Sequence, residues 1–115
     1  MTDGQWQVID LEEIKKEFKG ETVEYLEFLR VPTLSCGLYS LAAGSKDMQS
    51  PHDEDEVYVV LKGKARMRLG AEERSVGPGS LLYVGAATDH SFFEIEEDMT
   101  LLVFFASALT ANRSL

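Results

Sequence analysis

Residues 55–69, with the sequence DEVYVVLKGKARMRL, give the clearest structural signal in the chain. After the leading acids, residues 57–61 are apolar at both odd and even positions, so a strand here must be covered on both faces. In residues 64–69, Ala65, Met67 and Leu69 alternate with lysine and arginine, a period of two that is typical of a half-exposed strand. A glycine, Gly63, separates the two segments. The stretch therefore predicts two successive β-strands.

The same kind of signal continues on both sides of this stretch. Short apolar segments follow one another at the 8–12-residue spacing expected of sandwiches and barrels, with turn residues between them. The pattern of residues 21–27 is compatible with the start of a strand but also with a helix. Residues 99–106 are again apolar on both faces. The chain is therefore predicted to be all-β. The predicted strands span residues 33–41, 56–61, 64–69, 80–84, 90–95 and 99–106.

The first 20 residues differ from the rest. Residues 10–19 are predicted to form a short amphipathic helix, with Asp10 as N-cap and Gly20 as C-cap. We expect residues 1–20 to be a lead-in and helix packing on the barrel, residues 21–108 to form the barrel, and residues 109–115 to be a frayed tail. The large side chains expected in the core are Trp6, Tyr39, Met67, Tyr83, Phe92 and Phe104.

Composition excludes several classes of partner. The chain has 115 residues and a formal net charge of -9, which disfavours binding to nucleic acid or to an anionic membrane surface. The single cysteine, Cys36, makes no internal disulfide and is expected to be a small buried residue, which fits a cytoplasmic protein. No signal peptide and no membrane span are expected. The strands that are apolar on both faces need a cover on each. One cover is the opposing sheet, and the other is either the N-terminal helix or a second subunit, which suggests a homodimer.

The chemistry centres on the only two histidines, His52 and His90. Glu56 lies four residues after His52, so in extended chain the two side chains, together with Glu54 between them, have the same parity. Two imidazoles and a carboxylate form a ligand set for iron, and they also suit manganese, nickel or zinc. The alternative is structural: histidines on strands often only stabilise the core, and Glu56 would then hydrogen-bond to an imidazole.

The spacing of these residues resembles the two motifs of the cupin superfamily, whose RmlC-like members form a double-stranded β-helix, or jelly-roll barrel. The first motif corresponds to Gly44-x5-Ser50-Pro51-His52-x3-Glu56-x6-Gly63. The second corresponds to Gly79-x5-Gly85-x-Ala87-x2-His90-x3-Glu94. The resemblance covers about half of the chain and keeps the spacing at every anchor position.

The resemblance implies that His52, Glu56 and His90 bind a divalent metal. It also shows departures. Ser50 replaces the first histidine of the family, so water, substrate, Gln49 or Glu54 would fill the vacant position, or the metal would bind more weakly or not at all. Proline, glycine and asparagine of the second motif are replaced by Gly85, Ala87 and Glu94. We expect little effect at the first two, which lie in a turn, while Glu94 either faces the cavity or lies at the surface.

For function, the resemblance implies a metal-dependent enzyme, either a dioxygenase, a lyase or an isomerase, that acts on a small polar metabolite. The alternative is a non-catalytic module that binds or senses a small molecule, and a structural or storage role is a third possibility. The role of Arg30 is left open by the sequence, and so are the substrate and the identity of the metal.

Overall fold

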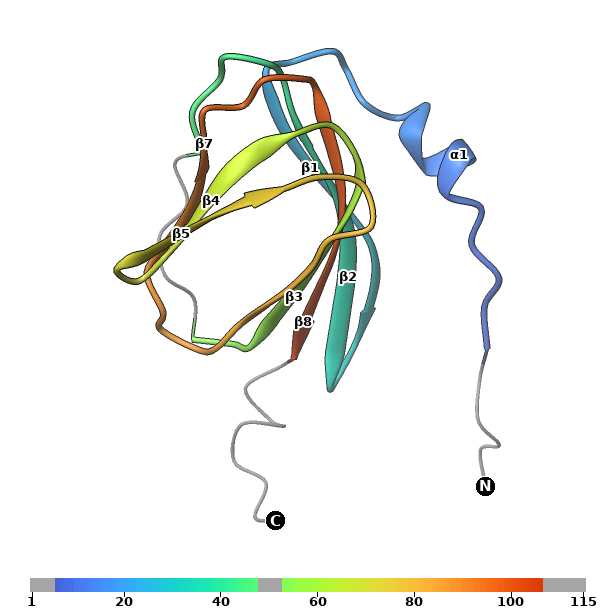
Figure 1. Ribbon diagram of the computed structural model, residues 1–115. Coiled ribbons are helices and arrows are strands. Elements are labelled where there is room, and N and C mark those ends of the chain that lie inside the picture. The colour runs from blue at the N-terminus through green and yellow to red at the C-terminus, as the bar shows by residue number, and fades with distance from the viewer. Residues whose placement is uncertain (1–5, 48–52, 107–115) are drawn as a thin grey trace, which may run out of the picture.

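The computed structural model describes residues 6–47 and 53–106, which fold into two antiparallel β-sheets that face each other (Figure 1). The five-stranded sheet has the order β1-β2-β8-β3-β6, and the three-stranded sheet has the order β5-β4-β7. The predicted all-β fold is confirmed. The elements are α1 (Leu11–Lys15), β1 (Val23–Val31), β2 (Leu34–Leu41), β3 (Glu56–Lys62), β4 (Ala65–Leu69), β5 (Glu72–Val76), β6 (Leu81–Val84), β7 (His90–Phe93) and β8 (Met99–Ala106).

The core fills the space between the two sheets, and the stretch that gave the clearest sequence signal supplies both walls. On β3, Tyr58 and Val60 are buried and face inward, while on the outer side Val57 and Val59 are half-buried and Leu61 is exposed. On β4, Ala65 and Met67 are buried and the arginines between them are not. The period of two therefore identified the inner face of the three-stranded sheet correctly.

The turn between β3 and β4 requires glycine. Gly63 has a φ of 95°, and a Cβ atom at this position would lie 2.5 Å from the carbonyl oxygen of Asp98. No side chain fits such an approach to the backbone, and only glycine adopts this φ without strain. The turn therefore lies directly against the backbone at the start of β8.

One strand was not predicted. β5 carries four exposed residues and a single buried one, Val76, so its sequence lacks an apolar alternation. It forms because its backbone pairs with β4 over five residues, from Ala65 opposite Val76 to Leu69 opposite Glu72. Strand formation here is a tertiary effect rather than a property of the segment itself.

The N-terminal helix is shorter than predicted. The carboxylate of Asp10 accepts a hydrogen bond from the backbone N–H of Glu12, which confirms the predicted N-cap. The helix ends at Lys15 rather than at residue 19, and none of its residues is buried. It stands beside the barrel (Figure 1), and its packing against a barrel stays a prediction. No helix among residues 6–47 and 53–106 is long and apolar enough to cross a membrane.

Three of the six predicted core residues, Trp6, Tyr83 and Phe104, lie outside the core. Phe104 is half-buried on the outer face of β8. Trp6 is 83% exposed because it lies in the N-terminal lead-in, and Tyr83 is 63% exposed because it faces outward from β6. Leu81, two residues earlier on the same outer face, is also exposed. The predicted homodimer would cover apolar side chains of this kind, and it stays a prediction.

Candidate metal centre

Glu56 and His90 are brought together inside the barrel by strands from different sheets. Glu56 is the first residue of β3, and His90 is the first residue of β7, opposite Leu69 of β4. Both residues are 1% exposed, and the Oε1 atom of Glu56 lies 3.3 Å from the Nε2 atom of His90. The predicted meeting of these two motif positions is therefore seen in the fold.

The imidazole of His90 is oriented by a backbone carbonyl. Its Nδ1 atom lies 2.8 Å from the oxygen of Thr88, and a carbonyl oxygen only accepts hydrogen bonds, so Nδ1 carries the proton. In the neutral ring, Nε2 then presents its lone pair to the barrel interior. Fixing one ring nitrogen through a backbone carbonyl is the usual way in which proteins orient a metal-binding histidine. The hydroxyl of Tyr58 lies 3.2 Å from the same Nε2 atom.

The distance between Glu56 and His90 fits a shared cation. Two atoms bound to one metal at about 2.1 Å, with a tetrahedral or octahedral angle between them, are about 3.0–3.4 Å apart. The observed 3.3 Å lies in this range. An ionised carboxylate and the lone pair of a neutral imidazole repel each other at this distance, so a proton or a metal ion between them stabilises the pair. The residues present therefore fit a divalent metal.

The remaining predicted ligands are not part of this pair. His52, Gln49 and Ser50 lie outside the described residues. Glu54 is half-buried on the wall of a separate pocket, and within the part of the chain that the structure describes no group of three or more His, Cys, Asp or Glu side chains could hold a metal. Glu94 is exposed at the end of β7, so it is a surface acid.

A second buried carboxylate, Asp47, was missed by the sequence analysis. Its Oδ1 atom accepts a hydrogen bond from the hydroxyl of Tyr39 at 2.7 Å, and its Oδ2 atom accepts one from the backbone N–H of Phe92 at 2.9 Å. Phe92 is on β7, an edge strand of the three-stranded sheet. Asp47 therefore ties the loop after β2 to the strand that carries His90. No motif marks this residue, because its partners come from distant segments.

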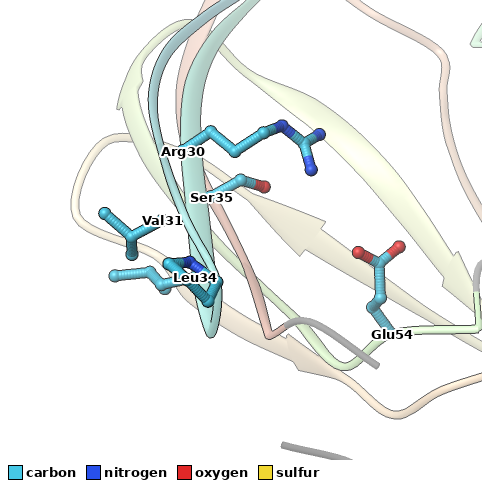
Figure 2. A pocket seen from close by; sticks show the side chains of 6 residues that line it. Arg30, Val31, Leu34, Ser35 and Glu54 are labelled. Atoms are coloured by element: carbon cyan, nitrogen blue, oxygen red, sulfur yellow. The ribbon is translucent and has the colours of Figure 1, made fainter. Parts of the chain in front are cut away.

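A pocket of about 370 Å³, the Arg30 pocket, is lined by Arg30, Val31, Pro32, Leu34, Ser35 and Glu54. Figure 2 shows Arg30 and Ser35 pointing toward the side on which the carboxylate of Glu54 lies, whereas Val31 and Leu34 point the other way.

Tyr25 lies on the same inner face as Arg30. Its ring makes edge contacts with Tyr39 and Phe105. Burial, together with the negative charges of Glu27 and Glu56, raises the pKa of Tyr25 to about 12. The hydroxyl is thus a neutral donor at physiological pH, in the electrostatic field of the same carboxylate that faces His90.

The fold and this site define a class of protein: a small double-stranded β-helix with an inward-facing carboxylate and histidine. The family model for the cupin domain matches residues 37–105, and the chain belongs to this family. An uncharacterised protein of Streptomyces coelicolor is 44% identical over 96 residues, which cover 84% of this chain and 91% of the relative.

Solved structures agree with the family assignment at the level of the fold. A protein from Thermus thermophilus has a TM-score of 0.74 at 24% identity, over 88% of this chain and 97% of that chain. The DMSP lyase DddQ from Ruegeria pomeroyi has a TM-score of 0.71 at 18% identity, over 81% of this chain and 50% of that chain. The resemblance inferred from the two motifs is therefore confirmed.

Proposed function

We propose that this cupin domain binds a divalent metal inside the barrel through Glu56, His90 and His52, and that it is a metal-dependent enzyme acting on a small polar metabolite. The observation that carries the proposal is the pair of Glu56 and His90. A buried carboxylate lies 3.3 Å from an imidazole nitrogen whose ring is oriented by the Thr88 carbonyl. His52 enters the proposal from the first motif alone.

The residues of the chain have separate tasks in this proposal. A bound divalent ion supplies Lewis-acid chemistry, which polarises an oxygen of the substrate. Glu56 contributes negative charge and His90 a neutral nitrogen, so the site keeps part of the positive charge of the ion. The apolar walls around them, including Phe92 and Val84, exclude water and strengthen the electrostatic interactions of the site. A dioxygenase, a lyase and an isomerase all use such an environment.

The alternative function is a non-catalytic module that binds or senses a small molecule. The replacement of a motif histidine by Ser50 favours this alternative, because it leaves one ligand fewer than the motif provides. The lyase among the structural neighbours indicates that this fold can house an enzyme of one of the three proposed types.

The first experiment is metal analysis of the purified protein. The protein is measured as purified, after treatment with a chelator, and after addition of Fe²⁺, Mn²⁺, Ni²⁺ or Zn²⁺. We expect about one ion per chain with at least one of these metals, and its loss with the chelator. If no ion is retained after supplementation, the proposed metal centre is wrong.

The second experiment separates the enzyme from the binding module. The metal-loaded protein is incubated with diketones, thiols and hydroxy acids while oxygen uptake and product formation are followed by electrode and by NMR. An enzyme converts at least one of these compounds, and the conversion stops in the Glu56→Gln variant. Binding without conversion across the panel favours the alternative.

A further inference from the structure

The five-stranded sheet places Arg30 and Glu56 in one row of paired residues. Arg30 pairs with Ser35, Ser35 with Phe105, and Phe105 with Glu56. Residues paired across neighbouring strands point to the same face of the sheet. Three strand spacings separate the two ends of the row, about 14 Å between the backbones. The guanidinium and the buried carboxylate therefore extend from the same inner face, at a separation that a small molecule can bridge.

A β-bulge gives Arg30 this orientation. The pairing between β1 and β2 shifts register between Glu27 and Leu29, so Glu27 pairs with Gly37 and Arg30 with Ser35. Residues three apart in a regular strand point to opposite faces, but the inserted residue brings Glu27 and Arg30 to the same face. Bulges of this kind often redirect a side chain next to a functional site. The Oε1 atom of Glu27 lies 2.8 Å from one nitrogen of Arg30, whose side chain is 72% exposed.

We propose that the Arg30 pocket binds a small hydroxy acid or amino acid, with Arg30 holding its carboxylate and Glu54 accepting a hydrogen bond from its hydroxyl or ammonium group. Figure 2 shows the carboxylate of Glu54 across the pocket from Arg30, so the two walls carry opposite charges. This inference names a ligand class for the proposed function, and it rests on that function only in taking this ligand to be the small polar metabolite of the enzyme.

The charges of the pocket select this class of ligand. A guanidinium has five N–H donors in a planar fork, so Arg30 can bind a carboxylate while it remains paired with Glu27. The buried Ser35 adds a hydroxyl beside it. Among the described residues at the pocket, one positive charge, on Arg30, faces two negative charges, on Glu27 and Glu54. A doubly charged phosphate is therefore disfavoured most and a single carboxylate less, and an amino acid fits the charges best because its ammonium group pairs with Glu54. The volume of about 370 Å³ lies at the small end of the range for ligand pockets, about 300–1,000 Å³.

The test uses three acids with three carbons each: propionate, L-lactate and L-alanine. Their binding is measured by titration calorimetry on chelator-treated protein and on Ni²⁺-loaded protein, with inorganic phosphate as a fourth ligand. The variants are Arg30→Gln and Glu54→Gln. Arg74→Gln is the matched control, because Arg74 is also an exposed strand arginine paired with a nearby glutamate, Glu72, but lies on β5 in the other sheet.

Arg30→Gln is expected to lower the affinity for each of the three acids by about tenfold or more, which is the usual effect of losing a charged hydrogen bond. Arg74→Gln is expected to change none of the three affinities by more than about twofold, which is within the range for an exposed ion pair. Glu54→Gln removes the charge that pairs with an ammonium group but keeps an oxygen acceptor, so it should weaken the binding of alanine more than that of lactate, and the binding of propionate should not become weaker. Equal effects of the two arginine variants, or tighter binding of phosphate than of the acids, would overturn the inference.

A Ni²⁺ titration of the same proteins separates this inference from the proposed metal centre. Arg30→Gln should bind Ni²⁺ like the wild type, because Arg30 is about 14 Å from Glu56 along the row. If the wild type binds no metal but binds the acids in an Arg30-dependent way, the metal centre fails and the inference holds. If the wild type binds metal and the Arg30→Gln variant binds the acids as tightly as the wild type, the inference fails and the metal centre stands.

Discussion

Two buried carboxylates in this barrel have contrasting surroundings. Asp47 accepts hydrogen bonds from the Tyr39 hydroxyl and the Phe92 backbone N–H, which are both donors in any protonation state at neutral pH. Glu56 faces Nε2 of His90, a nitrogen whose neutral form offers a lone pair rather than a proton. Donors stabilise a buried negative charge at once, whereas an imidazole lone pair does so only with a cation between the groups. We therefore expect Asp47 to act mainly in the fold and Glu56 mainly in the proposed site.

The largest effect that tests this contrast is expected from Glu56→Gln. The amide keeps the shape of the side chain but removes its charge, so we expect the metal affinity to fall by more than about 100-fold, since even the partners of metal ligands contribute about 10–100-fold. The free energy of unfolding of the metal-free protein should change less than it does when Asp47 is replaced, because the amide fills the same space. Metal titration and urea unfolding measure the two quantities. A loss of stability with no loss of affinity would reverse the roles assigned here.

Asp47→Asn is the complementary variant, in which stability and not metal affinity should change, and its effect is expected to be the next largest. The asparagine has one oxygen acceptor where the aspartate has two. If that oxygen stays on the backbone N–H of Phe92, the Tyr39 hydroxyl loses its anionic acceptor and has to turn so that it accepts from the new NH₂ group. Losing one charge-assisted buried hydrogen bond should lower the free energy of unfolding by about 2 kcal/mol. The metal affinity of the folded protein should stay within about threefold of the wild type, as no ligand is changed.

Asp98→Asn is the matched control for this variant. Asp98 is exposed, and its Oδ1 atom accepts one hydrogen bond, from the backbone N–H of Ala43. The asparagine keeps that acceptor, so urea unfolding should show a change within about 0.5 kcal/mol. If the free energy of unfolding falls by the same amount in the two variants, the buried hydrogen bonds of Asp47 to Tyr39 and Phe92 contribute no more to stability than the exposed one of Asp98.

The contrast also explains what the sequence could predict. Glu56 and His90 were found because each occupies a motif position with fixed spacing to a glycine turn, Gly63 or Gly79, and local spacing survives in the fold. Asp47 has partners on β2 and β7, and no local pattern records such a pairing. Tyr58 was within reach of sequence analysis, because it shares the parity of Glu56 on β3.

The strands also differ in whether a local sequence pattern predicts them. β4 was predicted from its alternation, whereas β5 has none and depends on pairing with β4. Arg30 was left open for a related reason. Its face is set by the bulge after Glu27, and an irregularity in register is not visible in a period of two.

The smallest effect is expected at Ala87, where the motif has glycine, and it tests whether the turn before β7 sets the geometry of His90. Ala87 has a φ of 62°, in the left-handed region that costs an alanine about 1 kcal/mol relative to glycine. Ala87→Gly should therefore raise the free energy of unfolding by about 0.5–1 kcal/mol in urea unfolding. Ala86, whose φ is not positive, is the control, and Ala86→Gly should lower stability by a similar amount. Because the Thr88 carbonyl and the pairing of His90 with Leu69 hold the imidazole, metal affinity should be the same in both variants as in the wild type. A change in affinity that follows the change in stability would mean that strain in this turn, and not the hydrogen bond to Thr88, positions His90 against Glu56.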